Sequence, residues 1–343
     1  PVVLSSPLEL DTLFCPQSNI TPNTSYIDDA QPRNSLPYLP RSEVLASRNN
    51  SACKSNRQLV GSRTRPPRPL SEVIASHLQF AIDVLKDTPR MMVLRNQTPW
   101  CHPSLYTNHL PRAMQDAYAC CSLYMSKTQI NAPVIMSLFE NRVRELLELP
   151  ETRNTRELLA RTHALILYQI MRLFDNAICT QPIAEALFTH LEASVNILMR
   201  TVCIPNPKQP IDLLPSSLNP IIEFWESWVL QESIRRTVLL TYFLMRVYRI
   251  LQGMVPVECD SKLGMCGNHA WYLSAHLWTA PNAFDFAIAW ARRDHLIVYD
   301  LDFTRTLTSA QPDDLDVFGR MLLVTILGSD KARAWFHVRG AVL

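Results

Sequence analysis

Glycine is scarce in this chain, with only seven among 343 residues. Tight β-turns and phosphate-binding loops rely on glycine, so this scarcity argues against a β-rich fold and against nucleotide-binding α/β folds. No apolar run reaches about 18 residues without a charge, which argues against a membrane-spanning helix. The hydrophobic content of 47% excludes wholesale disorder and suffices for a large core. Together these limits favour a helical protein without a membrane segment.

The charge and the cysteine content exclude two further classes. A net charge of +2 gives no basic surplus for binding nucleic acid through its phosphates. Nine cysteines are an odd number without disulfide-scaffold spacing, and most lie in apolar helical patterns where free cysteine behaves as a small hydrophobe. No signal peptide opens the chain. We therefore expect a reducing compartment, the cytosol or the nucleus.

The common motifs of catalysis and cofactor binding are also missing. G-x-S-x-G, H-E-x-x-H, G-x-G-x-x-G and G-x4-G-K-[ST] do not occur. No C-x2-C pair occurs either, although the common zinc modules depend on such pairs. We therefore expect no enzyme activity, no catalytic residue and no bound cofactor or metal in this chain.

The nearest approach to a metal site is Cys259, Cys266 and His269, with His276 seven residues further on. Their spacing matches no common zinc module, so we interpret them as incidental loop residues. The adjacent Cys-His pair at 101–102 is weaker still, because neighbouring residues are strained when they share one ion. Three single histidines in apolar or amphipathic context are expected to be hydrogen-bonded structural residues: His163, His190 and His295.

One acidic cluster resembles the metal-binding DDxxD box of terpene cyclases. It comprises Asp313, Asp314 and Asp316, but its fifth position is Val317 and no second metal-binding motif accompanies it. Carboxylates near a helix start are stabilised by the helix macrodipole alone. We interpret the cluster as a helix cap, and a helical enzyme of the terpenoid-cyclase type remains the alternative.

Residues 1–69 differ in composition from the rest of the chain. They hold ten of the 25 prolines, among serine, asparagine and threonine, with little periodic apolar pattern. We interpret them as a linker or disordered arm. Their end, residues 54–69, carries five basic residues and no acid. A nuclear-import or DNA-flanking segment and a plain solvated linker both fit this pattern.

From residue 70 onward the apolar residues recur with the period of an α-helix. The first stripe runs from Leu70 to Leu85, after a candidate cap at Ser71. Prolines and capping residues then predict the boundaries: a loop at about 88–109, helix starts near Pro111, Pro133 and Pro182, a cap at Thr155, and a loop at 203–220.

Shorter helices are expected near the carboxyl end, over 270–278, 282–293, 313–328 and 330–338. Segment 295–301, HLIVYDL, has the β-branched content of a strand but no visible partner. The sequence therefore predicts an all-α fold: a compact stack of about nine or ten helices over residues 70–343, with a disordered N-terminal arm over residues 1–69.

The most informative segment is 221–252, which reads as one long helix. Pro220 is tolerated in the first turn, and no glycine interrupts the segment until Gly253. Glu232 precedes Arg235 by three residues and Arg236 by four, so both arginines are within reach as ion-pair partners. The segment is apolar on most of its circumference, so we expect a central helix that other helices surround.

This segment carries a family resemblance. The order W-x2-W-x3-E-x2-R-R-T, from Trp225 to Thr237, resembles the middle homology region of fungal binuclear-zinc-cluster transcription factors. The run LWTAPNAFDFAIAWARR at 277–293 is similar to an element that follows it in many of those proteins. These motifs consist of helix-packing residues and carry no chemistry of their own.

The resemblance implies a regulatory domain of a nuclear transcription factor, one that controls RNA polymerase II transcription of a metabolic or secondary-metabolite pathway. In that family the zinc cluster that contacts DNA precedes a linker. Because no C-x2-C pair occurs, we expect DNA contacts and zinc only in a module outside these residues, which either precedes Pro1 or is missing altogether. The implied partners are another protein or a second copy, and a small-molecule effector. A co-regulator that lacks DNA binding is a further alternative.

The resemblance also marks candidate residues for the core or for an effector pocket. We expect the tryptophans to help form the core or line a cavity, and the ion pairs to fix the long helix against its neighbours. The candidates are Trp225, Trp228, Glu232, Arg235, Arg236, Thr237 and Trp278.

Overall fold

The computed structural model describes residues 70–150, 152–174, 181–203, 219–252, 269–304 and 306–343. All of them fall in one of the two units into which the chain divides. The predicted arm over residues 1–69 and the weak metal candidates Cys259 and Cys266 lie outside the described residues.

The amino-terminal part is a series of antiparallel and crossing helices, α1 to α6. Each helix from α2 to α6 packs on the next one along the chain, and α5 also packs on α2 and α3. The elements are α1 (Leu70–Val73), a π-helical turn (Ile74–Leu78), α2 (Gln79–Arg95), α3 (Arg112–Met125), α4 (Ala132–Glu148), α5 (Thr155–Phe174) and α6 (Gln181–Met199).

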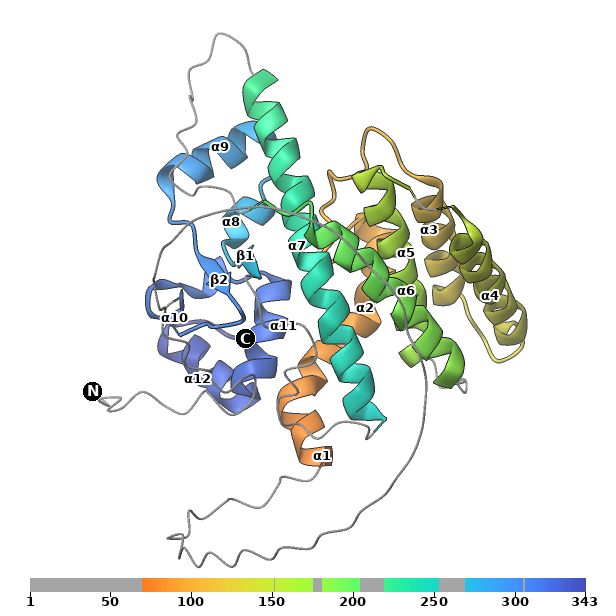
Figure 1. Ribbon diagram of the computed structural model, residues 1–343. Helices are drawn as coiled ribbons and strands as arrows, with labels where there is room; N and C mark the ends of the chain where they lie inside the picture. Colours follow the sequence, from red (N-terminus) through yellow and green to blue (C-terminus); the bar gives the residue numbers. More distant parts are fainter. Residues whose placement is uncertain (1–69, 151, 175–180, 204–218, 253–268, 305) are drawn as a thin grey trace, which may run out of the picture. The chain divides into compact units, whose positions relative to one another are not determined.

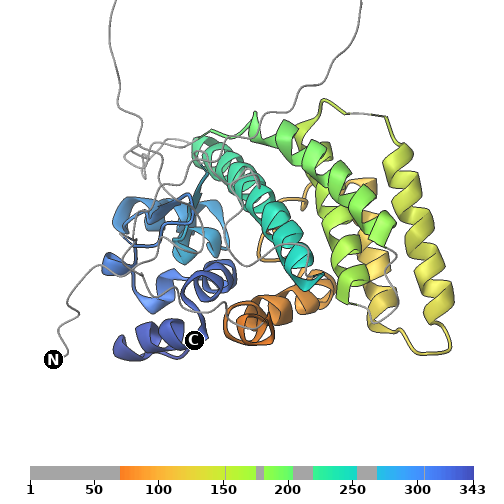
Figure 2. The ribbon, with the colours of Figure 1, turned by 60° about the horizontal axis from the view of Figure 1, so that its bottom comes forward.

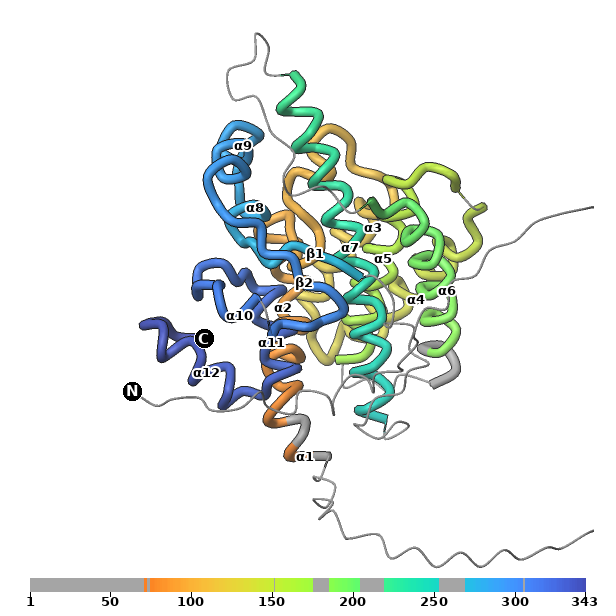
Figure 3. Tube along the Cα trace, turned by 60° about the vertical axis from the view of Figure 1, so that its left-hand side comes forward, coloured from red at the N-terminus to blue at the C-terminus, as the bar shows by residue number. Residues whose placement is uncertain are grey.

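The long helix α7 spans Asn219–Leu251 and confirms the central prediction. Its residues are buried without interruption from 232 to 248. It packs against α5 and α6 on one side, and against α9 (Ala283–Arg292) and the strand β1 (Ala270–Tyr272) on the other. Figures 1 and 2 show α7 between the amino-terminal helices and the carboxyl-terminal elements, and Figure 3 shows the same arrangement from the side.

The carboxyl-terminal elements form the second wall around α7. Helix α11 (Val317–Leu327) also packs on α2, so this part of the chain closes back onto the amino-terminal helices. The elements after α9 are β2 (Ile297–Tyr299), α10 (Thr306–Ser309), a 3-10 turn (Pro312–Asp314), α11 (Val317–Leu327) and α12 (Ser329–Val338). Nine helices in the described residues are ten residues or longer, as the all-α prediction requires.

One expected helix is wrong. Residues 270–278 contain the strand β1 followed by the short helix α8 (Ala275–Trp278). β1 pairs antiparallel with β2, with Trp271 opposite Val298. The strand-like segment at 295–301 therefore has its partner in a segment read as helical. A pairing between segments that are separated along the chain leaves no local pattern. Local periodicity therefore predicted a helix over residues 270–278 where a strand forms.

Two boundary predictions are also wrong. Helix α2 continues to Arg95 with Pro89 inside it, although a loop was expected from residue 88. Proline has no N–H for the carbonyl of Leu85, but the Thr88 hydroxyl donates to that carbonyl at 2.7 Å and satisfies it. The cap of α5 is Asn154 in place of Thr155, since its side-chain oxygen accepts from the N–H of Arg156 at 2.9 Å.

Candidate functional site

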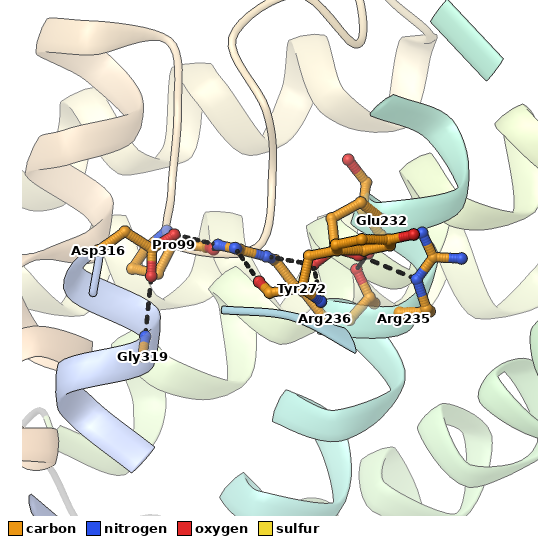
Figure 4. Close-up of polar contacts among 9 residues, drawn as sticks. Pro99, Glu232, Arg235, Arg236, Tyr272, Asp316 and Gly319 are labelled. Atoms are coloured by element: carbon orange, nitrogen blue, oxygen red, sulfur yellow. Dashed lines mark hydrogen bonds and ion pairs between the residues drawn. The ribbon is translucent and has the colours of Figure 1, made fainter. Parts of the chain in front are cut away.

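Helical spacing brings Glu232 and both arginines onto one face of α7. The Glu232 carboxylate accepts from Arg235 Nε at 2.9 Å and from Arg236 Nε at 2.9 Å. It also accepts from the backbone N–H of Tyr272 at 3.2 Å, which connects α7 to β1. Glu232 and Arg236 are fully buried, and Arg235 is 5% exposed. Figure 4 shows this carboxylate between its two guanidinium partners.

Arg236 connects α7 to four other parts of the chain. Its Nη1 donates to the carbonyl of Pro99 at 3.1 Å and pairs with the carboxylate of Asp316, and its Nη2 donates to the carbonyl of Tyr272 at 3.1 Å (Figure 4). The guanidinium also lies 3.9 Å from the centroid of the Trp278 ring, close enough for a strong cation–π contact. The loop after α2, the strand β1, helix α8 and the start of α11 therefore meet at one side chain.

The charges in this network balance. Glu232 and Asp316 supply two negative charges, and Arg235 and Arg236 supply two positive ones. Buried charges persist only when they are paired and hydrogen-bonded. Arg235 Nη1 also donates to the carbonyl of Cys203 at 2.7 Å, whereas its buried Nη2 has no hydrogen-bond partner among the described residues. A paired Arg235 fits the predicted ion-pair role on α7.

Two carboxylates of the acidic cluster cap helical turns, as the capping interpretation predicts. Asp316 is the N-cap of α11, and its Oδ1 accepts from the N–H of Gly319 at 2.8 Å. Asp314 accepts from the N–H of Gln311 at 2.8 Å. Because one oxygen of Asp316 caps α11 and the other meets Arg236, that carboxylate has no free oxygen for a metal of the terpene-cyclase type.

Thr237 belongs to a buried hydrogen-bonded chain with a fixed direction. Its hydroxyl donates to the carbonyl of Ser233 at 2.6 Å, so it accepts from His163 Nε2 at 2.7 Å. His163 Nδ1 is then an acceptor for the Tyr106 hydroxyl at 3.0 Å. This arrangement assigns the proton to Nε2 and confirms that His163 is a hydrogen-bonded structural residue.

Burial of His163 sets an expected pH dependence. Burial lowers the pKa of its imidazole to about 3. Burial is also the main cause that lowers the pKa of His102 to about 4. Both pKa values are below the usual value near 6.5, so between about pH 3 and pH 6.5 the unfolded chain binds more protons than the folded chain. The stability that the two neutral imidazoles contribute is therefore fully present above about pH 6.5 and is lost as the pH falls toward 3.

We expect the free energy of unfolding to fall by about 1–2 kcal/mol for each of these two histidines between pH 7.5 and pH 5. Urea denaturation at the two pH values measures this. The variant His163→Gln should lose less stability over that interval than the wild type. Equal losses in the two proteins would contradict the buried neutral imidazole.

The three candidate tryptophans occupy different environments. Trp228 is 3% exposed and packs against Phe286, with 5.0 Å between ring centroids, and against Tyr272 at 5.6 Å. Trp225 is partly exposed. Between Trp225 and Trp278 lies His102, edge-on to both at centroid distances of 6.1 and 5.0 Å. Trp228 and Trp278 are thus core residues, and Trp278 and Trp225 also line clefts.

Several contributing residues carried no signal in the sequence. Nothing in the pattern linked Pro99, Tyr272 or Asp316 to Arg236, because their contacts depend on segments that are far apart along the chain. Tyr106 and His102 were likewise outside the candidate set. Within the described residues, no group of three or more histidine, cysteine or acidic side chains could hold a metal ion. No helix described here is long and apolar enough to span a membrane.

Comparison with known proteins gives one informative match. The chain is 26% identical over 265 residues to the transcription factor gsfR2 of Penicillium aethiopicum. The match covers 76% of this chain, and the chain spans 62% of the length of that relative. No protein-family model matches the chain, and no solved structure matches it. The chain is similar to a fungal transcription factor.

Proposed function

We propose that residues 70–343 form the regulatory, middle homology region of a fungal transcription factor. The region controls RNA polymerase II transcription of a metabolic or secondary-metabolite pathway, acts in the nucleus, and works through protein contacts and a small effector. DNA is contacted by a zinc-cluster module outside these residues. The observation that carries the proposal is the similarity to a fungal transcription factor over 76% of the chain.

The arrangement of charge supports this proposal over catalysis. The two buried carboxylates of the network, Glu232 and Asp316, are held by arginines and backbone N–H groups. A general acid or base needs a free oxygen that can reach a substrate proton. A network of this kind suits a domain that must keep several segments in one arrangement and present a fixed surface to partners.

We expect recruitment of the full chain to a promoter to change transcription. The chain is fused to a heterologous DNA-binding domain, and a reporter with matching upstream sites is measured in a filamentous fungus. A change of at least about fivefold in either direction is expected, and the same fusion carrying the surface change Arg112→Met should behave alike.

The same experiment separates the alternatives. A fluorescent tag should place the full chain in the nucleus. An unchanged reporter, together with magnesium-dependent release of pyrophosphate from prenyl diphosphates by the purified chain, would support the terpenoid-cyclase alternative and contradict the proposal. Native-promoter activity that needs a second DNA-binding protein would indicate the co-regulator.

A further inference from the structure

Two clefts meet beside the loop that follows α2. One has a volume of about 540 Å³ and includes Trp278 in its lining, and the other has a volume of about 680 Å³ and includes Trp225. Ser104, Thr107 and Pro281 line both clefts, so the two spaces adjoin. Volumes of this size are typical of small-molecule sites in proteins.

Each cleft has aromatic residues in its lining, with His102 and Trp278 in the first and Trp225 in the second. His102 stands edge-on to Trp278 and Trp225, with both interplanar angles at 85°. Met91 and Phe318 add apolar surface to the first cleft, and Val229 adds it to the second. Flat apolar ligands pack well on such surfaces, because aromatic rings favour stacked and edge-to-face contacts.

The charged groups in the lining do not select a charged ligand. In the first cleft the carboxylate of Asp316 is already paired with Arg236, and Arg95 is exposed to solvent. In the second cleft Glu157 is bonded to Arg161 at 3.3 Å, and the opposite charges of Arg156 and Glu226 both line the wall. A strongly charged ligand would meet no concentrated opposite charge in either cleft.

One ring N–H group at this site lacks a hydrogen bond. The Trp225 indole Nε1 has no acceptor among the described residues. His102 Nδ1 accepts from the N–H of Ser104 at 3.1 Å, so the neutral ring carries its proton on Nε2, which meets the backbone of Trp278. An unused buried donor is costly, and an acceptor oxygen on a ligand that reached Trp225 Nε1 would relieve that cost.

We propose that the joined clefts bind a neutral, flat aromatic compound that carries at least one carbonyl or ether oxygen. This compound would be the small effector of the proposed function. The binding itself does not depend on that function, whereas its effect on transcription does. The Trp278 ring that borders the first cleft also covers Arg236, so a bound compound lies directly against the side chain that joins α7 to its neighbours.

Binding is tested on the purified full chain with three probes. Coumarin is flat, neutral and has a carbonyl acceptor, naphthalene lacks the acceptor, and coumarin-3-carboxylate adds a charge. We expect coumarin to bind with a Kd below about 1 mM, as its size allows, and to shift the indole N–H resonance of Trp225. Naphthalene and the carboxylate should each bind at least about fivefold more weakly.

Variants locate the site. Trp225→Phe keeps a ring but removes the N–H and should weaken coumarin binding at least about threefold. Thr107→Trp fills the junction from an exposed position and should abolish binding without changing the melting temperature. The control Trp335→Phe removes the same kind of N–H outside the clefts, where it donates to the Leu307 carbonyl at 3.4 Å, and should bind coumarin normally.

The proposal is wrong if coumarin does not bind the folded wild type at 1 mM, if Thr107→Trp binds it unchanged, or if the carboxylate binds best. None of these outcomes bears on the reporter experiment. A protein that regulates the tethered reporter but ignores coumarin would retain the proposed function and lose only the ligand site.

Discussion

Replacing Arg236 by methionine is expected to lower the free energy of unfolding by about 3–5 kcal/mol. Methionine keeps most of the length of the side chain but removes the charge. Glu232 and Asp316 would then remain without this partner, and the carbonyls of Pro99 and Tyr272 would each lose a donor. The loss is large because a buried charge that has lost its partner keeps its full desolvation cost.

The matched control for this variant is Arg112→Met. Arg112 also pairs with an aspartate, Asp116, at 3.0 Å, but its side chain is 72% exposed. Exposed ion pairs contribute little, so the control should lose less than about 1 kcal/mol. Urea denaturation of both variants measures the difference. Similar losses of unfolding free energy in the two variants would show that the buried Arg236 network stabilises the fold no more than an exposed ion pair does.

Replacing Trp228 by alanine is the second change with a large expected effect. Trp228 is 3% exposed and packs between Tyr272 and Phe286. Its indole N–H has no hydrogen-bond partner in the part of the chain that the structure describes, so the loss comes from packing and the cavity that remains. We expect a loss of about 3–5 kcal/mol in the free energy of unfolding.

Trp225→Ala provides the comparison for this prediction. Trp225 lies three residues earlier on the same helix and is partly exposed, so its removal should cost clearly less than that of Trp228. The two variants are compared by thermal and urea denaturation under one set of conditions. If Trp225→Ala were the more destabilising change, Trp228 would not be the core residue of the pair.

The central helix could be predicted because its signals are local. An uninterrupted apolar segment, a proline near its start and the i, i+3 and i+4 spacing of Glu232, Arg235 and Arg236 all depend on neighbours along the chain. Helix α7 and its two ion pairs follow directly from those signals. The capping use of Asp316 was likewise predictable, because capping involves only residues within one turn.

What could not be predicted depends on distant segments. The pairing of β1 with β2 needs two short strands that mean little alone. The acceptance of Pro89 within α2 is a local exception, because it depends on the Thr88 hydroxyl donating to the Leu85 carbonyl. The Arg236 contacts with Pro99 and Asp316, and the chain from Tyr106 to Thr237, join residues whose spacing in the sequence has no helical or strand period.

The most direct test of the account is a double-mutant cycle between Arg236 and Asp316, which lie on α7 and at the start of α11. Asp316→Asn keeps an oxygen that can cap α11 and removes the charge. We predict that the double variant Arg236→Met/Asp316→Asn is more stable than the sum of the single losses implies, by about 1.5–3 kcal/mol. Losses that add to within about 0.5 kcal/mol would contradict the claim that this buried pair joins the two helices.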